Sequence, residues 1–250
     1  MSILRIEGVS KRFGSLVAVD NVSLNVQPGE LRAVIGPNGA GKTTFFNMIS
    51  GFLSPSAGKI TFNETDVTDM PPVQRVWSGM ARTFQITEIF PELSVYENIR
   101  VAVEVAEGYR LTFRMPAEGG EKVAARVADL MRMGGLTNKA DRIAGELSHG
   151  DQRATEIMMA IALNPKLLLL DEPTAGMGDQ ETYDVTQLIR KLHRDEKLTI
   201  VLIEHDMRVV FHLADRITVL AEGKMLAEGT PPEIAANEVV QAAYLGKGAA

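Results

Sequence analysis

A glycine-rich stretch, Gly-Pro-Asn-Gly-Ala-Gly-Lys-Thr-Thr, follows an apolar run and fits the phosphate-loop pattern G-x-x-x-x-G-K-[ST]. Glycines let backbone N–H groups turn toward phosphate oxygens, and a helix that begins at the loop directs its positive end at them. We expect Lys42 to reach the β- and γ-phosphates of a nucleotide and the Thr43 hydroxyl to bind Mg²⁺. A glycine-rich turn without a ligand is the alternative, which the full match between a strand and a helix disfavours. The expected nucleotide contacts are Gly36, Pro37, Asn38, Gly39, Ala40, Gly41, Lys42, Thr43 and Thr44.

Two adjacent carboxylates end a second apolar run, which is typical of a strand buried on both faces of a parallel sheet. The run is Leu167 to Leu170, and Asp171 and Glu172 follow it. At the carboxyl end of such a strand we expect Asp171 to hold Mg²⁺, directly or through water, and Glu172 to polarise an attacking water. A capped strand followed by an Asp-Glu-Pro turn is the alternative, which the phosphate loop upstream disfavours.

Four further positions indicate a function only when their order along the chain is considered together with the two motifs above. Ser148 and Gly150 lie in Leu-Ser-His-Gly-Asp-Gln-Arg, where a helix start could bind an anion but by itself is an ordinary N-cap. Gln85 follows a short strand predicted over Met80 to Phe84, and His205 follows a second buried strand. Taken alone, each of these two side chains would be an ordinary loop residue.

Hydrophobic periodicity predicts the elements that position these groups. A strand over Ile3–Val9 and two short strands within Leu16–Val26 indicate an antiparallel opening, and Ser94 with Glu97 fits a capping box at a helix start. The stretch 108–120 reads as irregular. Further strands are predicted over Lys59–Phe62, Thr199–Ile203, Arg216–Ala221 and Lys224–Glu228, and helices over Thr43–Ser50, Val95–Ala106, Glu121–Met133, Gln152–Leu163, Gln180–His193, Asp206–Ala214 and Pro232–Tyr244.

Composition bounds the class of protein. The 250 residues are 45% apolar and 23% charged, which is typical of a globular protein with one large domain or a core with an insertion. A net charge of −6 argues against a nucleic-acid partner. The chain has no cysteine, no signal-peptide layout at its start and no apolar run long enough to span a bilayer, so we expect a cytoplasmic protein.

In this order the motifs resemble an ATP-binding cassette (ABC) ATPase over nearly the whole chain. Residues 147–151 are similar to that family's signature Leu-Ser-Gly-Gly-Gln, with His149 and Asp151 as substitutions. The resemblance implies an α/β fold in which a RecA-like P-loop core with a mixed sheet and helices carries an antiparallel β subdomain and an inserted helical subdomain. On this pattern 1–250 is one domain, with core and β subdomain at about 1–89 and 164–250 and the helical subdomain at about 90–163.

The resemblance also implies roles for single residues. Phe13 would stack on adenine, Gln85 would contact Mg²⁺ or the attacking water and sense a transporter partner, and His205 would contact the γ-phosphate. Ser148 and Gly150 would contact the γ-phosphate of ATP bound to a second subunit, so the ATP site would form in a homodimer or in a heterodimer with a sister ATPase. The segment after Glu172 departs from the pattern, because Gly178 replaces an aspartate expected to couple the two sites.

Family members that move nothing across membranes are one alternative, such as soluble ATPases of DNA repair, translation or cluster assembly. A single cassette, a modest insertion and the lack of a heptad run favour a transporter subunit, peripheral on the inner face of the membrane through integral-membrane permease subunits. Several stretches are similar to the LivG-like ATPases of branched-chain amino-acid importers, while urea or short-amide importers and lipopolysaccharide exporters are alternatives. We expect residues 86–97 to form a groove for a permease helix; an ordinary edge of the core is the alternative. The stretches similar to the LivG-like type are Ala81-Arg-Thr-Phe-Gln85, Ala175-Gly-Met, Ile203-Glu-His-Asp-Met207 and Ala243-Tyr-Leu-Gly246.

Overall fold

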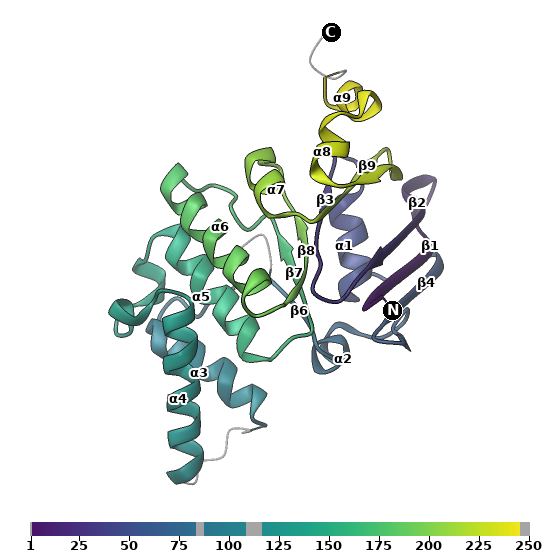
Figure 1. The fold of residues 1–250 in the computed structure, drawn as a ribbon. Coiled ribbons are helices and arrows are strands. Elements are labelled where there is room, and N and C mark those ends of the chain that lie inside the picture. The colour runs from purple at the N-terminus through teal and green to yellow at the C-terminus, as the bar shows by residue number, and fades with distance from the viewer. Residues whose placement is uncertain (1, 84–87, 109–116, 246–250) are drawn as a thin grey trace.

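Two sheets organise the chain, of which the computed structural model describes residues 2–83, 88–108 and 117–245 (Figure 1). An antiparallel four-stranded sheet has the order β2-β1-β4-β5, and a six-stranded sheet has the order β10-β9-β3-β8-β7-β6. The first sheet comprises β1 (Leu4–Phe13), β2 (Leu16–Val26), β4 (Ala57–Phe62) and β5 (Thr65–Asp66). The second comprises β3 (Leu31–Ile35), β6 (Met80–Arg82), β7 (Leu167–Asp171), β8 (Thr199–Ile203), β9 (Arg216–Ala221) and β10 (Lys224–Gly229).

The six-stranded sheet brings the predicted motifs to one edge. Strands β6, β7, β8, β3 and β9 pair in parallel, and β10 adds an antiparallel edge. Every residue of β3, β7 and β8 is buried, which explains their uninterrupted apolar runs. The carboxyl ends of these three central strands lead into the phosphate loop, the Asp171–Glu172 pair and His205 respectively. Parallel strands present ligand-binding groups at this edge.

Helix α1 (Lys42–Ser50) lies between the two sheets (Figure 1). Its buried side chains Phe45, Phe46 and Ile49 belong to one core cluster with residues of β1, β2 and β4 and with Val201 of β8. The phosphate loop is therefore anchored by a helix that both sheets hold.

Helices also cover the other face of the large sheet. Side chains alternate along the central strands, so that Leu168 faces these helices while Leu169 faces α1. Helix α3 begins with the predicted capping box, in which Ser94 Oγ accepts the Glu97 N–H at 3.2 Å. Helices α5 (His149–Ala162), α6 (Asp179–Arg194) and α7 (Met207–Leu213) lie on this face. Helices α3 (Val95–Ala106) and α4 (Ala117–Met133) pack on α5, farther from the sheet (Figure 1).

The predicted fold class is confirmed, with local corrections. Residues 16–26 form one continuous strand and not two, because β2 pairs with β1 along its whole length. Residues 117–120, expected to be irregular, begin α4. The predicted C-terminal helix is two helices, since Asn237 Oδ1 accepts the Val239 N–H and starts a second one. The remaining helices are α2 (Pro72–Trp77), α8 (Pro231–Ala235) and α9 (Glu238–Leu245). Within the described residues, no helix combines the length and apolarity needed to cross a bilayer.

Candidate nucleotide-binding site

Two glycines fix the path of the phosphate loop between β3 and α1. Gly41 has φ 93°, and a β-carbon there would lie 2.4 Å from the backbone oxygen of Ala18. A β-carbon at Gly36 would lie 2.1 Å from the backbone oxygen of Leu220. No other residue type fits these two positions, and the loop is thereby held against β2 and β9 in one shape. Its backbone is arranged for an anion before any ligand arrives.

Lys42 is folded back across this loop. Its Nζ donates to the backbone oxygens of Gly36 at 2.7 Å and Pro37 at 3.1 Å. Burial lowers the pKa of Lys42, while the nearby charges of Glu172 and Asp171 raise it. The ammonium is thus held at the phosphate loop and near two carboxylates. In this position it can contact the phosphates of a nucleotide while the carboxylates are available for a metal ion.

Most of the predicted nucleotide-binding residues line one cavity of about 570 Å³. Its walls include loop residues 38–44, together with Glu172 and His205. Asp171 lies just beneath, only 4% exposed. Gly36 and Pro37 do not line the cavity; instead, their backbone oxygens accept hydrogen bonds from Lys42 Nζ. The volume is in the range of nucleotide- and cofactor-sized sites.

Glu172 and His205 are in direct contact within this cavity. His205 Nε2 lies 2.6 Å from Glu172 Oε1. Glu172 adopts a φ of 45°, which is strained for a residue with a side chain, and its N–H is held by the backbone oxygen of Ile203 at 3.0 Å. Strain of this kind concentrates at functional sites, and a carboxylate oriented by an imidazole is a suitable group to polarise water.

Two arginines whose role no sequence motif indicated hold Asp171. Arg82 Nη2 lies 2.8 Å from Asp171 Oδ2, and Arg153 Nη2 donates to the Asp171 backbone oxygen at 2.7 Å. Arg82 belongs to β6 and Arg153 to the signature helix α5. The available signal for Arg82 was a charged side chain directly after two apolar residues of a short strand, which it ends.

Glu204 is a further residue that the sequence analysis missed. It is 3% exposed, and its carboxylate accepts the backbone N–H groups of Thr174 at 3.1 Å and His205 at 2.7 Å. It also accepts the Thr174 hydroxyl. Glu204 thereby connects the segment after Glu172 to the segment that carries His205.

The groups around Lys42 fit a bound Mg²⁺. Across the described ranges no three acidic or histidine side chains cluster into a metal cage. Mg²⁺ does not need one beside a nucleotide, because one or two protein oxygens complement phosphate oxygens and water. Thr43 lines the cavity, and the charge of the nearby Asp171 carboxylate partly offsets the lowering of the Lys42 pKa by burial.

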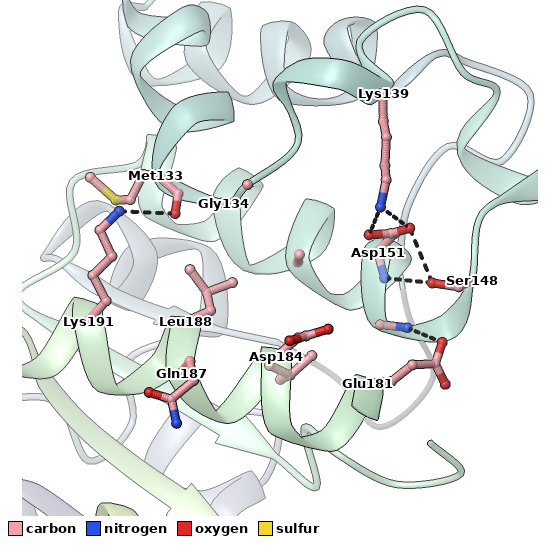
Figure 2. A pocket seen from close by; sticks show the side chains of 14 residues that line it. Met133, Gly134, Lys139, Ser148, Asp151, Glu181, Asp184, Gln187, Leu188 and Lys191 are labelled. Carbon is pink, nitrogen blue, oxygen red and sulfur yellow. Dashed lines mark hydrogen bonds and ion pairs between the residues drawn. The ribbon is translucent and has the colours of Figure 1, made fainter. Parts of the chain in front are cut away.

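The signature residues lie at a different cavity, of about 400 Å³ (Figure 2). Ser148 is the N-cap of α5, where its Oγ accepts the Asp151 N–H at 3.3 Å. Gly150 donates its N–H to Glu181 Oε1 at 3.2 Å. No phosphate-loop residue lines this cavity among the parts that the structure describes. The structure therefore separates Ser148 and Gly150 from Lys42 of the same chain.

The remaining predicted residues have three different outcomes. Phe13 ends β1 with 47% exposure and is not on the wall of the larger cavity. Gln85 lies outside the described residues. Gly178 is the N-cap of α6, while the side chain of Asp179 is 91% exposed and its Oδ1 lies 3.5 Å from Arg208 Nη1.

A phosphate loop after β3, a carboxylate pair at the end of β7 in the same sheet and an antiparallel sheet packed over α1 define a cassette-type P-loop ATPase. The profile of the ABC transporter family matches residues 19–175, and the chain belongs to that family. A profile described as branched-chain amino acid ATP-binding cassette transporter matches residues 224–250. These matches confirm the predicted family and its ATP-hydrolysing activity.

Individual relatives agree with the family assignment. The chain is 41% identical to the high-affinity branched-chain amino acid transport ATP-binding protein LivG of Salmonella typhimurium over 98% of both chains. It is 34% identical to the lipopolysaccharide export system ATP-binding protein LptB of Escherichia coli over 99% of this chain and 98% of that one.

Solved structures match the fold. The ADP conformation of an ATP-binding cassette of an ABC transporter superposes with a TM-score of 0.86 at 30% identity, covering 98% of this chain and 99% of that one. A dimeric post-hydrolysis cassette bound to ADP and Pi has a TM-score of 0.76 at 26% identity, covering 91% and 98%.

Proposed function

We propose that this chain is the ATP-hydrolysing subunit of an importer for branched-chain or other hydrophobic amino acids. The observation that carries the substrate class is the match of residues 224–250 to a profile named for branched-chain amino acids. The identity of 41% to LivG against 34% to LptB favours import of amino acids over export of lipopolysaccharide.

In the proposed reaction, water attacks the γ-phosphate of ATP bound at the phosphate loop. Glu172 orients that water, and His205, in contact with it at 2.6 Å, orients Glu172 and contacts the γ-phosphate. Lys42 exchanges its contacts with the loop oxygens for phosphate oxygens. Phe13 stacks on the adenine, and Gln85 contacts the attacking water.

Asp171, Thr43 and Gln85 are the proposed Mg²⁺ ligands. When bound, Mg²⁺ neutralises charge on the β- and γ-phosphates. Arg82 acts on this group of ligands through Asp171: its contact with Oδ2 at 2.8 Å fixes the direction of the carboxylate. Arg153 fixes the backbone at the same residue.

We infer that the ATP site is completed by a second ATPase subunit, either another copy or a sister chain. The support is the separation of the two cavities: the γ-phosphate donors Ser148 and Gly150 do not line the cavity of their own Lys42. A dimeric relative bound to ADP and Pi has the same fold. ATP then lies between two subunits, and hydrolysis lets them part.

The proposed membrane partners are permease subunits that hold this chain at the cytoplasmic face. Residues 90–163 would form the helical subdomain that faces them, attached to a core and β subdomain at about 1–89 and 164–250. Within the expected groove, Phe90 is 48% exposed, and Asn98 Nδ2 donates to its backbone oxygen at 3.0 Å. Residues 86 and 87 of this expected groove, and residues 84 and 85 before it, lie outside the described ranges.

Co-purification and uptake test this assignment together. The tagged chain should retain its permease subunits, and vesicles holding the complex should take up radiolabelled leucine when ATP is supplied. Glu172→Gln should abolish uptake, whereas Glu196→Gln, an exposed carboxylate outside the cavity, should not. ATP-dependent uptake of urea, or of no amino acid, would refute the substrate class.

A further inference from the structure

The signature half-site is covered by a side chain of its own subunit. Glu181 Oε1 accepts the Gly150 N–H at 3.2 Å (Figure 2). Glu181 Oε2 accepts the Gly178 N–H at 3.3 Å. One carboxylate therefore caps the start of α5 and the start of α6 together. Gly150 is buried under this side chain: a β-carbon built on it would lie 3.1 Å from the Glu181 β-carbon.

A phosphate oxygen and Glu181 cannot use the Gly150 N–H at once. A backbone N–H carries one proton and serves one well-aligned acceptor. Both acceptors are anions, so they also repel each other. Ser148 is exposed, and its hydroxyl also interacts with the Glu181 carboxylate. The neighbouring Asp151 is neutralised by Lys139, whose Nζ lies 2.6 Å from both carboxylate oxygens. Glu181 is thus the anion that directly blocks the donor.

We propose that Glu181 is a gate on the signature half-site: its carboxylate holds the Gly150 N–H until the γ-phosphate bound to a second subunit displaces it. The inference rests on the proposed composite site. Displacement would break the hydrogen bond by which Glu181 of α6 holds the Gly150 N–H of α5. This contact lies at the end of the segment that begins with Glu172. Glu181 is therefore a positioning residue. When the nucleotide of the second subunit arrives, Glu181 moves, and the segment that leads back from it to Glu172 is released.

The test uses the full chain with Glu172→Gln, in which ATP-bound dimers should accumulate, and measures the ATP concentration that gives half-maximal dimerisation by sedimentation. Adding Glu181→Ala should lower that concentration about three- to tenfold, the range for loss of one competing hydrogen bond. Glu181→Gln keeps an acceptor without the charge, so its shift should be smaller and in the same direction. Asp184→Asn is the matched control, since Asp184 lies on the same helix and cavity but makes no contact with Gly150, and it should cause no shift.

The sign of the shift separates the gate from a structural role. A side chain that only caps α6 would, when removed, lower the melting temperature and raise the ATP requirement. An unchanged or raised ATP requirement in Glu181→Ala would overturn the gate while leaving the proposed function intact. If the Glu172→Gln parent does not dimerise with ATP, that would instead count against a composite site formed by two copies of this chain. It would also count against the gate proposed within that site.

Discussion

The phosphate-loop side and the signature side of this molecule are prepared differently for the same ligand. At the loop, two glycines fix the backbone, Lys42 is in place, and Glu172 already contacts His205 at 2.6 Å. At the signature, the Gly150 N–H is taken by Glu181. The phosphate-loop side is thus assembled by residues of its own chain, whereas the donor on the signature side is occupied by a residue of its own chain. The difference is what the proposed composite site predicts: ATP binds first at the loop, and the signature joins only when a second subunit supplies the phosphate.

The largest expected effect is on the loop side. Glu172→Gln removes the carboxylate that orients water, so we expect the ATPase rate to fall about 10²- to 10⁴-fold while ATP binding is retained. Phosphate release and nucleotide binding should be measured on the same preparation, with Glu196→Gln as the control. A Glu172→Gln variant that hydrolyses ATP at the wild-type rate would refute the proposed role of Glu172 in orienting the attacking water.

Arg82→Met should destabilise the loop side of the core. It breaks the buried ion pair with Asp171 and the hydrogen bonds to Asn47 at 2.7 Å and Ser50 at 2.6 Å. Leaving a buried carboxylate without its arginine costs about 3–5 kcal/mol, measurable by urea unfolding. The control Arg100→Met disrupts an exposed pair with Glu104 and should cost no more than about 1 kcal/mol. Equal losses in the two variants would contradict the role of Arg82.

His205→Ala should have a smaller effect on the rate, roughly 10- to 100-fold, because the carboxylate stays but loses the imidazole that orients it. The loss should appear in kcat with little change in the ATP concentration at half-saturation. His212→Ala is the control, since that exposed ring contacts Arg190 at the surface. A loss confined to ATP affinity would show that His205 binds nucleotide without orienting Glu172.

The smallest effect is expected at the signature and depends on pH. Hydrogen bonds from the Gly150 and Gly178 N–H groups lower the pKa of Glu181. Because the folded pKa is depressed, this stabilisation is present above the unfolded value of about 4.3 and is lost as pH falls through the folded value. NMR titration of the Glu181 carboxyl should give a midpoint below about 4.3. A midpoint at or above it would show that the contact with Gly150 does not persist in solution.

The sequence predicted the loop side better than the signature side for a physical reason. The phosphate loop, Asp171 and Glu172 are encoded by contiguous residues and by strand periodicity, so local patterns reveal them. The contacts of Arg82, Glu204 and Glu181 span 89, 30 and 31 residues, and no local pattern records which distant backbone group a side chain will meet. The C-terminal helix was misjudged because the cap of Asn237 overrides an otherwise continuous helical run.

Mixing two inactive variants tests the composite site most directly. Lys42→Ala removes the loop half and Ser148→Arg the signature half, so each variant alone should be inactive. In an equal mixture half of the pairs are mixed, and each mixed pair keeps one intact site of two. The mixture should therefore recover about one quarter of the wild-type ATPase rate if the sites act independently. A Ser148→Arg chain that hydrolyses ATP at the wild-type rate alone, or a mixture without recovery, would contradict the division of the site between two subunits.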